Sequence, residues 1–261
     1  MKKLVFISAL IFVFFIYNAS GFADSSDSSG DKTEYQLLIS GVMGYANNKD
    51  MNASAENEAK FQAEALNFYY YGINYPYKIN SKKANLPVGV DIDFRLFSDN
   101  IGIGLQVGYH TAKAESEVSS ASFPDKDRID ITYELSVVPI VGTLFYRMNF
   151  ESSNSFVLFG GGIGYYFGLM TVDFKWQNNM YGLAGMDSND GTRTVIGLHA
   201  LIEYDYVFDM GFTIFGGIKA RYVRFDEFDK DEKFYIADSN WEKIKANLTG
   251  VAAYIGAGYS F

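Results

Sequence analysis

The sequence predicts an all-β fold, namely an eight-stranded antiparallel up-and-down transmembrane β-barrel. Three observations lead to this expectation: eight segments place apolar residues at every second position, the connections alternate between short and long, and the last segment ends on an aromatic residue, Phe261. Alternation with a period of two is the mark of a strand whose two faces meet different surroundings. In a membrane barrel these surroundings are lipid and lumen.

Each of the eight segments is long enough to cross a bilayer at a tilt, for which a strand needs about 9–11 residues. In the second segment, for example, Val88, Val90 and Ile92 alternate with Gly89 and Asp91. One face is therefore apolar and the other carries charge and glycine. The predicted strands are 35–46, 87–97, 101–113, 129–148, 156–172, 193–208, 212–225 and 248–261.

The connections between these strands predict the topology. Tight periplasmic turns and longer extracellular loops are typical of outer-membrane barrels, and an even number of strands leaves both termini in the periplasm. The short connections are 98–100, 151–155 and 209–211, and the predicted extracellular loops are 47–86, 114–128, 173–192 and 226–247.

The fourth predicted strand, 129–148, loses its clean alternation near Pro139. Proline has no N–H to give to a neighbouring strand, and in sheets it is common at bulges. We therefore expect a bulge or bend at this position.

The final segment carries a candidate assembly signal. It resembles the C-terminal targeting signal of bacterial outer-membrane barrels, with Tyr254, Gly256, Tyr259 and Phe261 in the places of that pattern. The alternative is an ordinary edge strand at the end of the chain, which would leave its aromatic residues at a frayed terminus.

The first 23 residues have the features of a cleaved signal peptide. Lys2 and Lys3 precede an apolar run at 4–17, and the small residues Gly21 and Ala23 predict a cut before Asp24. The apolar run is short for a spanning helix. We expect 24–34 to be an N-terminal periplasmic segment and 35–261 to be the barrel with its four loops.

Composition narrows the classes of partner. The chain has no cysteine, which excludes disulfides, thiolate metal sites and a lipoprotein anchor. Its net charge is −9, and removal of residues 1–23, with two lysines and no acid, makes it −11. Phosphates would be repelled, so a nucleic-acid partner is not expected.

With these residues in view, residues 33–261 resemble the small eight-stranded outer-membrane barrels, namely the OmpA transmembrane domain, OmpX and OmpW. The resemblance implies a multi-pass monomer in the bacterial outer membrane of a diderm bacterium, in contact with membrane lipids and lipopolysaccharide. It also implies periplasmic chaperones and the barrel-assembly machinery as partners during biogenesis. A wall-anchoring domain such as that of full-length OmpA-like proteins is not expected.

Charged residues on the predicted inner faces form a candidate lumen network. Eight strands leave an interior that side chains can fill, and charges buried there need partners. The network is either a salt-bridged plug or a gated polar path, and the hairpin at 209–211 is expected to bring its members from the sixth and seventh strands together. The members are Asp91, Asp93, Arg95, Glu134, Glu203, Asp205, Lys219 and Arg221.

Catalysis has few candidate residues. The only histidines are His110 and His199, and Glu203, four residues beyond His199, would lie about 13 Å away along a strand. That is too far for a hydrogen bond, so we expect no catalytic residues, no metal site and no cofactor.

The first predicted loop holds a tyrosine cluster. Tyrosine supplies amphipathic contact area at a low entropic cost. The cluster is a candidate contact surface for an extracellular partner, or else it extends the neighbouring strands above the membrane. Its members are Tyr69, Tyr70, Tyr71, Tyr75 and Tyr77.

These observations predict a non-enzymatic outer-membrane protein with a structural or surface-contact role, in adhesion or envelope integrity. The alternative is a narrow passive channel for ions or small solutes. A third reading is an outer-membrane lipid-modifying enzyme.

Overall fold

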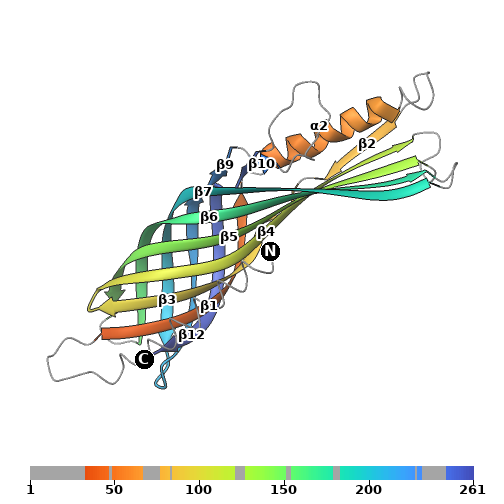
Figure 1. Cartoon of the computed structure of the whole chain (residues 1–261). Coiled ribbons are helices and arrows are strands. Elements are labelled where there is room, and N and C mark those ends of the chain that lie inside the picture. The colour runs from red at the N-terminus through yellow and green to blue at the C-terminus, as the bar shows by residue number, and fades with distance from the viewer. Residues whose placement is uncertain are drawn as a thin grey trace.

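The computed structural model describes residues 33–46, 49–66, 77–82, 84–120, 127–150, 154–178, 183–226, 228–230 and 245–261. Figure 1 shows these residues as a barrel from which a long, twisted sheet extends to one side. The C-terminus lies at the end of the barrel far from this sheet.

Eight antiparallel strands close into the barrel, which confirms the predicted fold class. Each strand pairs with the next along the chain, and the last pairs with the first. They are β1 (Thr33–Ala46), β3 (Val88–Ser98), β4 (Ile101–Ser120), β5 (Asp127–Asn149), β6 (Ser155–Asn178), β7 (Leu183–Val207), β8 (Phe212–Tyr222) and β12 (Gly250–Ser260).

Four of these strands are much longer than the barrel requires. β4, β5, β6 and β7 have 20, 23, 24 and 25 residues, whereas β3, β8 and β12 have 11 each. Their far ends form the sheet outside the barrel, which we call the arm (Figure 1). Strand β2 (Tyr77–Lys82) pairs with β4 along the arm, and helix α2 (Lys49–Leu66) packs against β2, β4 and β5.

Shorter strands complete the described chain. β10 (Asp229–Lys230) pairs with β7 where the arm begins, and β9 (Arg224–Phe225) pairs with β11 (Ala246–Asn247). Phe225, Phe228 and Leu248 belong to the same buried apolar cluster as the inner face of the arm. The cluster also contains Val141, the cross-strand neighbour of the buried Gln106, so it reaches from the arm into the barrel.

The predicted loops are therefore largely regular structure. Strands β4 and β5 fill most of 114–128, strands β6 and β7 fill most of 173–192, and 47–86 contains α2 and β2. The prediction of long loops was wrong here because the strands change their polarity pattern where they leave the membrane.

Strand β5 shows this change. Its outward residues are apolar on the barrel, as at Ile140 and Leu144, but polar on the arm, as at Asp130 and Thr132. The register with β4 and β6 is the same on both sides of Pro139, so a bulge at this position is contradicted, although Val138 and Pro139 themselves are not paired in the ladder with β4. What looked like a loss of alternation is a change of surroundings on an unbroken strand.

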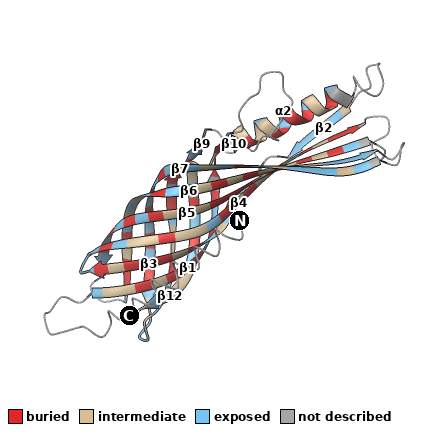
Figure 2. Ribbon diagram, in the orientation of Figure 1, coloured by how far each residue is buried: buried red, intermediate tan, exposed pale blue. Residues whose placement is uncertain are grey.

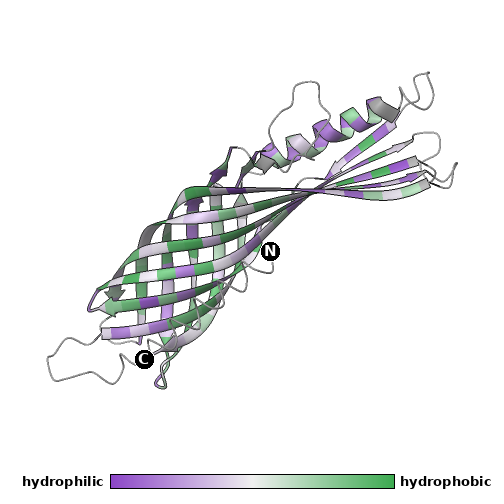
Figure 3. Ribbon diagram, in the orientation of Figure 1, coloured by the Kyte–Doolittle hydropathy of each residue, from purple (hydrophilic) through white to green (hydrophobic). Residues whose placement is uncertain are grey.

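The outer face of the barrel is an apolar belt. Large residues such as Ile103, Ile163, Ile202 and Ile255 are 56–70% exposed. Figure 2 shows exposed residues alternating with buried ones along the barrel strands, and Figure 3 shows that the arm is more hydrophilic than the barrel. Soluble surfaces rarely expose apolar area on this scale. A closed barrel satisfies its backbone hydrogen bonds without water, so the belt fits a lipid environment.

Large side chains and glycines alternate across the lumen. Phe145 lies opposite Gly102 and Gly160 in the two neighbouring strands, and Phe215 lies opposite Gly256. Small barrels fill their interior by this pairing of large and small residues. The glycines on the inner faces of these strands make room for the large side chains opposite them.

The glycines at 160–162 provide a matched test of that packing. A Cβ at Gly162 would collide with the Gly142 carbonyl oxygen and lie 2.6 Å from the His199 ring, whereas a Cβ at Gly161 meets nothing closer than 3.9 Å. Gly162→Ala should lower the free energy of unfolding by about 1–3 kcal/mol. Gly161→Ala should be neutral or stabilise by up to about 1 kcal/mol. Urea unfolding in lipid vesicles measures both, and equal effects would contradict the packing described.

Helix α2 follows from an alanine- and glutamate-rich segment, since both residues favour helix. Met51, Ala55 and Ala59 recur every four residues and so share one face, which is buried against Ile131 and Tyr133 of β5. Asn52 accepts a hydrogen bond of 2.6 Å from the backbone N–H of Ala84 and fixes the helix to the segment that leads into the barrel strand β3. Burial against this helix raises the pKa of Tyr133.

Candidate functional site

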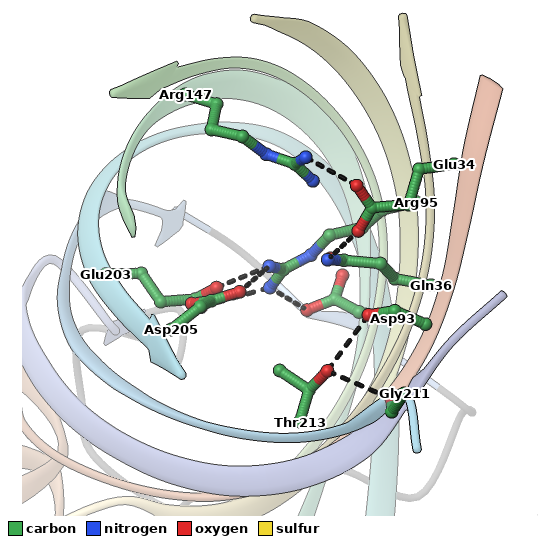
Figure 4. Close-up of polar contacts among 10 residues, drawn as sticks. Glu34, Gln36, Asp93, Arg95, Arg147, Glu203, Asp205, Gly211 and Thr213 are labelled. Atoms are coloured by element: carbon green, nitrogen blue, oxygen red, sulfur yellow. Dashed lines mark hydrogen bonds and ion pairs between the residues drawn. The ribbon is translucent and has the colours of Figure 1, made fainter. Parts of the chain in front are cut away.

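The first polar layer of the lumen is organised around Arg95 (Figure 4). Both terminal nitrogens of its guanidinium donate to Glu203, one of them at 3.0 Å, and Nη2 also donates to Asp93 at 3.4 Å. The Asp205 carboxylate lies 3.8 Å from Nη1. Arg95 is 1% exposed, and its guanidinium also lies over the rings of Phe145 and Phe215. We call Asp93, Arg95, Glu203 and Asp205 the lower layer.

A second arginine lies closer to the end with the short turns. The guanidinium of Arg147 lies between the rings of Phe97 and Phe156, at 4.0 and 4.3 Å from their centroids, and donates to Glu34. Gln36 donates to the other oxygen of Glu34 at 2.9 Å. Figure 4 shows Arg147, Glu34 and Gln36 beside the lower layer.

The upper layer, nearer the arm, connects charges through a histidine. His110 Nε2 lies 2.7 Å from Asp91, and its Nδ1 lies 2.6 Å from Arg221. Arginine can only donate, so Nδ1 accepts and Nε2–H donates to Asp91. Lys219 contacts the same carboxylate at 3.5 Å and donates to Gln106 at 2.8 Å.

The other histidine does not form a catalytic pair with Glu203. His199 Nε2 lies 3.0 Å from the Thr143 hydroxyl and is the cross-strand neighbour of Arg221. Glu203 is bound to Arg95 instead. Among the described residues, no group of three or more His, Cys, Asp or Glu side chains has metal-site geometry.

The structure brings together seven of the eight predicted lumen residues, in different pairs from those expected. Glu203 and Asp205 are not beside Lys219 and Arg221, because the β7–β8 register sets Arg221 against His199 and Lys219 against Leu201. Glu134 lies on the outer face of the arm, opposite Lys113. Its assignment to the lumen was wrong, because the assumed break in phase at Pro139 is not there.

Several lumen residues were missed from the sequence. Their signal was available, because each lies on the inward parity of its strand. Neutral residues and one distant arginine do not stand out without the register that places them next to the charges, and Glu34 lies just before the first predicted strand. They are Glu34, Gln36, Gln106, Thr143 and Arg147.

The four residues of the candidate assembly signal divide between the two faces of β12. Tyr254 is buried in the lumen with its ring below the Lys219 ammonium, at 5.3 Å, and Gly256 lies on the same face. Tyr259 and Phe261 face outward. Phe261 exchanges two backbone hydrogen bonds with Tyr35, of 2.8 and 2.9 Å, and the two rings stack.

The tyrosine cluster is only partly described. Tyr69, Tyr70, Tyr71 and Tyr75 lie outside the described residues. Tyr77 begins β2 and packs on the buried apolar cluster, which agrees with the reading as a strand extension at this one position.

The outer face of the arm is a charged surface with a hollow of about 460 Å³. Lys113 and Lys82 both bind Glu115, at 2.8 and 3.1 Å, and hold the pKa of that carboxyl below its usual range. Arg128 of β5 binds Glu117 in the neighbouring strand β4 at 3.1 Å and Asp130 in its own strand at 2.8 Å. The arm thus has an apolar face covered by α2 and a polar face open to solvent.

No protein-family model and no curated protein matches the chain. Among solved structures, it is similar to the attachment invasion locus protein Ail of Yersinia pestis, with 12% identity and a TM-score of 0.32 over 88% of this chain and 99% of that one. Neisserial surface protein A shows 11% identity and a TM-score of 0.35, over 89% of this chain and 98% of that one. A major outer membrane protein of Thermus thermophilus shows 10% identity and a TM-score of 0.42, over 87% of this chain and 99% of that one.

None of the helices in the described ranges is long and apolar enough to span a membrane. The closed ring of eight antiparallel strands and its apolar outer belt define the described chain as a transmembrane β-barrel with an attached arm.

Proposed function

We propose that this protein is a non-enzymatic outer-membrane protein of a diderm bacterium, in which the barrel anchors the arm at the cell surface for contact with other molecules. Adhesion or envelope integrity is the role of that contact. The observation that carries the proposal is the continuation of four barrel strands into a folded sheet beyond the apolar belt. Lipid anchoring alone does not require that extension.

The filled lumen supports an anchor rather than a conduit. Arg95, Glu203, Phe215 and Leu158 from four different strands are each no more than 2% exposed. Charges from opposite walls meet in the middle of the barrel, as between β3 and β7. Side chains of this size in direct contact leave little room for a solute.

The edges of the arm supply a mode of contact. Within the described ranges, β7 from Leu183 to Asp190 pairs with β6 alone, and β2 pairs with β4 alone. An edge strand offers a row of backbone donors and acceptors to an added strand. Lys78 and Lys82 lie on the β2 edge, whereas the β7 edge from 183 to 190 contains neither lysine nor proline. Lysine is the charge that natural edges use most against unwanted pairing, and proline also blocks it, so β7, whose edge charges are Asp187 and Asp190, is the more receptive edge.

Lysine substitutions on that edge test the proposed contact. Met186→Lys combined with Ser188→Lys should reduce attachment of expressing cells to epithelial monolayers and matrix-coated plates, because edge lysines oppose strand addition. Thr132→Lys is the control, since Thr132 lies in the central strand β5 of the same sheet. Heat-modifiable gel mobility reports folding, and cell sensitivity to detergent reports envelope integrity. A double variant that folds, attaches and protects the envelope like wild type would remove the support for contact through this edge.

A further inference from the structure

A groove of about 550 Å³ lies on the outer face of the barrel at the end with the short turns. Leu96, Ile101, Ile103 and Tyr146 give it an apolar wall, and the last three of them are more than half exposed. The rim is polar and consists of the β3–β4 turn, residues 98–100. An apolar wall below a polar rim matches an acyl chain below its headgroup.

The groove lies at one end of a ladder of aromatic rings that follows this end of the barrel. Ring contacts join Phe94 to Tyr35, Tyr35 to Phe261, and Phe261 to Tyr259, at 6.0–6.4 Å between centroids. Tyr259 is the cross-strand neighbour of Phe212, which continues the ladder through Phe208 to Tyr206. Aromatic rings are typical of the membrane interface. The groove lies beyond the β3 end of this ladder, where Ile101 and Ile103 of β4 replace the rings.

The rim is held in a fixed geometry. Arg147 N–H donates to the Asn100 carbonyl at 2.7 Å, and the Asn149 amide donates to Asn100 Oδ1 at 3.1 Å. Asp99 has a φ of 55°, a left-handed conformation that aspartate and asparagine tolerate better than most residues. The turn therefore presents its side chains from a backbone that is fastened to β5.

The rim offers the groups that a zwitterionic headgroup needs. Asn100 Nδ2 and the Ser98 hydroxyl are donors for a phosphate, and the Asp99 carboxylate is an acceptor for an ammonium group. The residues that line the groove include no lysine or arginine. An anionic headgroup would meet Asp99 without a compensating cation, whereas an amine-bearing headgroup would complement it.

We propose that this groove binds a phospholipid with an amine-bearing headgroup, with an acyl chain along Ile101, Ile103 and Tyr146 and the ammonium group at Asp99. The inference rests on the proposed function in one respect, because it requires this end of the barrel to lie at the periplasmic leaflet.

Native mass spectrometry of the refolded full chain tests the site. The protein is released from vesicles with equal amounts of phosphatidylethanolamine and phosphatidylglycerol, and the retained lipids are counted. Wild type should retain phosphatidylethanolamine in preference, by about two- to fivefold, the range of an exposed ion pair. Asp99→Asn, which keeps the left-handed turn, should abolish the preference. Ile103→Trp, which fills the groove, should lower the total lipid retained.

Asp209→Asn is the matched control, because Asp209 lies in the β7–β8 turn beside the aromatic ladder. It should retain the wild-type preference. Equal retention of the two lipids by wild type, retention of detergent alone, or an unchanged preference in Asp99→Asn would each overturn the proposed site. These readouts are independent of the arm, so failure here leaves the surface role standing. Surface labelling that placed residues 98–100 outside the cell would instead remove the orientation on which both rest.

Discussion

Alanine in place of Arg95 is expected to lower the free energy of unfolding by about 3–5 kcal/mol, because it leaves buried carboxylates without their partner. Glu203 and Asp205 have fully buried side chains, and Asp93 is nearly so. The arginine also packs on the Phe145 ring. Equilibrium urea unfolding of protein refolded into lipid vesicles measures the change, and planar-bilayer recordings of the same preparation should show conductance rising from near zero.

Arg128→Ala is the matched control for this prediction. Arg128 also binds two carboxylates, but about half of its side chain is exposed on the arm. Its loss should cost less than about 1 kcal/mol, as expected for surface ion pairs. The double variant Arg95→Met with Glu203→Gln should lose less free energy of unfolding than the two single variants lose when their losses are added. The reason is that each substitution removes the charge that the other leaves unpaired. Similar losses for Arg95→Ala and Arg128→Ala would contradict a buried network in the lumen.

Serine in place of Phe261 is expected to reduce the amount of folded protein in the outer membrane severely while export continues. Phe261 is half exposed on the lipid face, and serine at this position can keep both backbone hydrogen bonds to Tyr35. The variant should therefore refold in vitro with a stability close to wild type. A defect confined to cells would identify the ring as part of an assembly signal. Heat-modifiable mobility in membrane fractions measures the folded amount.

Tyr222→Ser provides the comparison, since Tyr222 is an exposed aromatic residue on the outer face of the neighbouring strand β8, toward the arm. Its loss should leave assembly unchanged. If Phe261→Ser reaches the membrane as efficiently as Tyr222→Ser, the terminal residue carries no assembly information. If neither variant accumulates as folded protein in the outer membrane, assembly depends on the lipid-facing belt as a whole and not on the terminal residue.

The barrel was predictable because each of its strands has one lipid face, and lipid imposes a strict apolar period. The arm was not, because above the membrane the same strands reverse their polarity. Thr132 and Glu134 lie on the same outward face of β5 as Val138 and Ile140. Because they are polar, the sequence pattern alone assigns them to the inner face. A change in solvent and a bulge give the same sequence pattern near Pro139. The helix was missed for a related reason, since the small face of Ala55, Ala59 and Ala63 is weakly apolar.

The sequence predicted most of the charged residues that enter the lumen, but not which of them pair with each other. Inward parity identified Arg95, Asp91 and Glu203 as lumen groups, but the partner of Arg95 lies on the far wall, 108 residues away. Contacts across the barrel depend on its closure and on how far each side chain reaches, neither of which strand alternation contains. The same limit applies to the β7–β8 hairpin, where the turn alone did not fix which charges oppose each other.

Surface labelling of single-cysteine variants tests the central claim most directly, because the native chain has no cysteine. Ser188 is exposed on the arm, and Met210 is 81% exposed in the β7–β8 turn. With a membrane-impermeant maleimide, Ser188→Cys should be labelled on intact cells, and Met210→Cys should be labelled only after the outer membrane is permeabilised. Labelling of Met210→Cys but not Ser188→Cys on intact cells would place the arm inside the envelope and contradict a surface role.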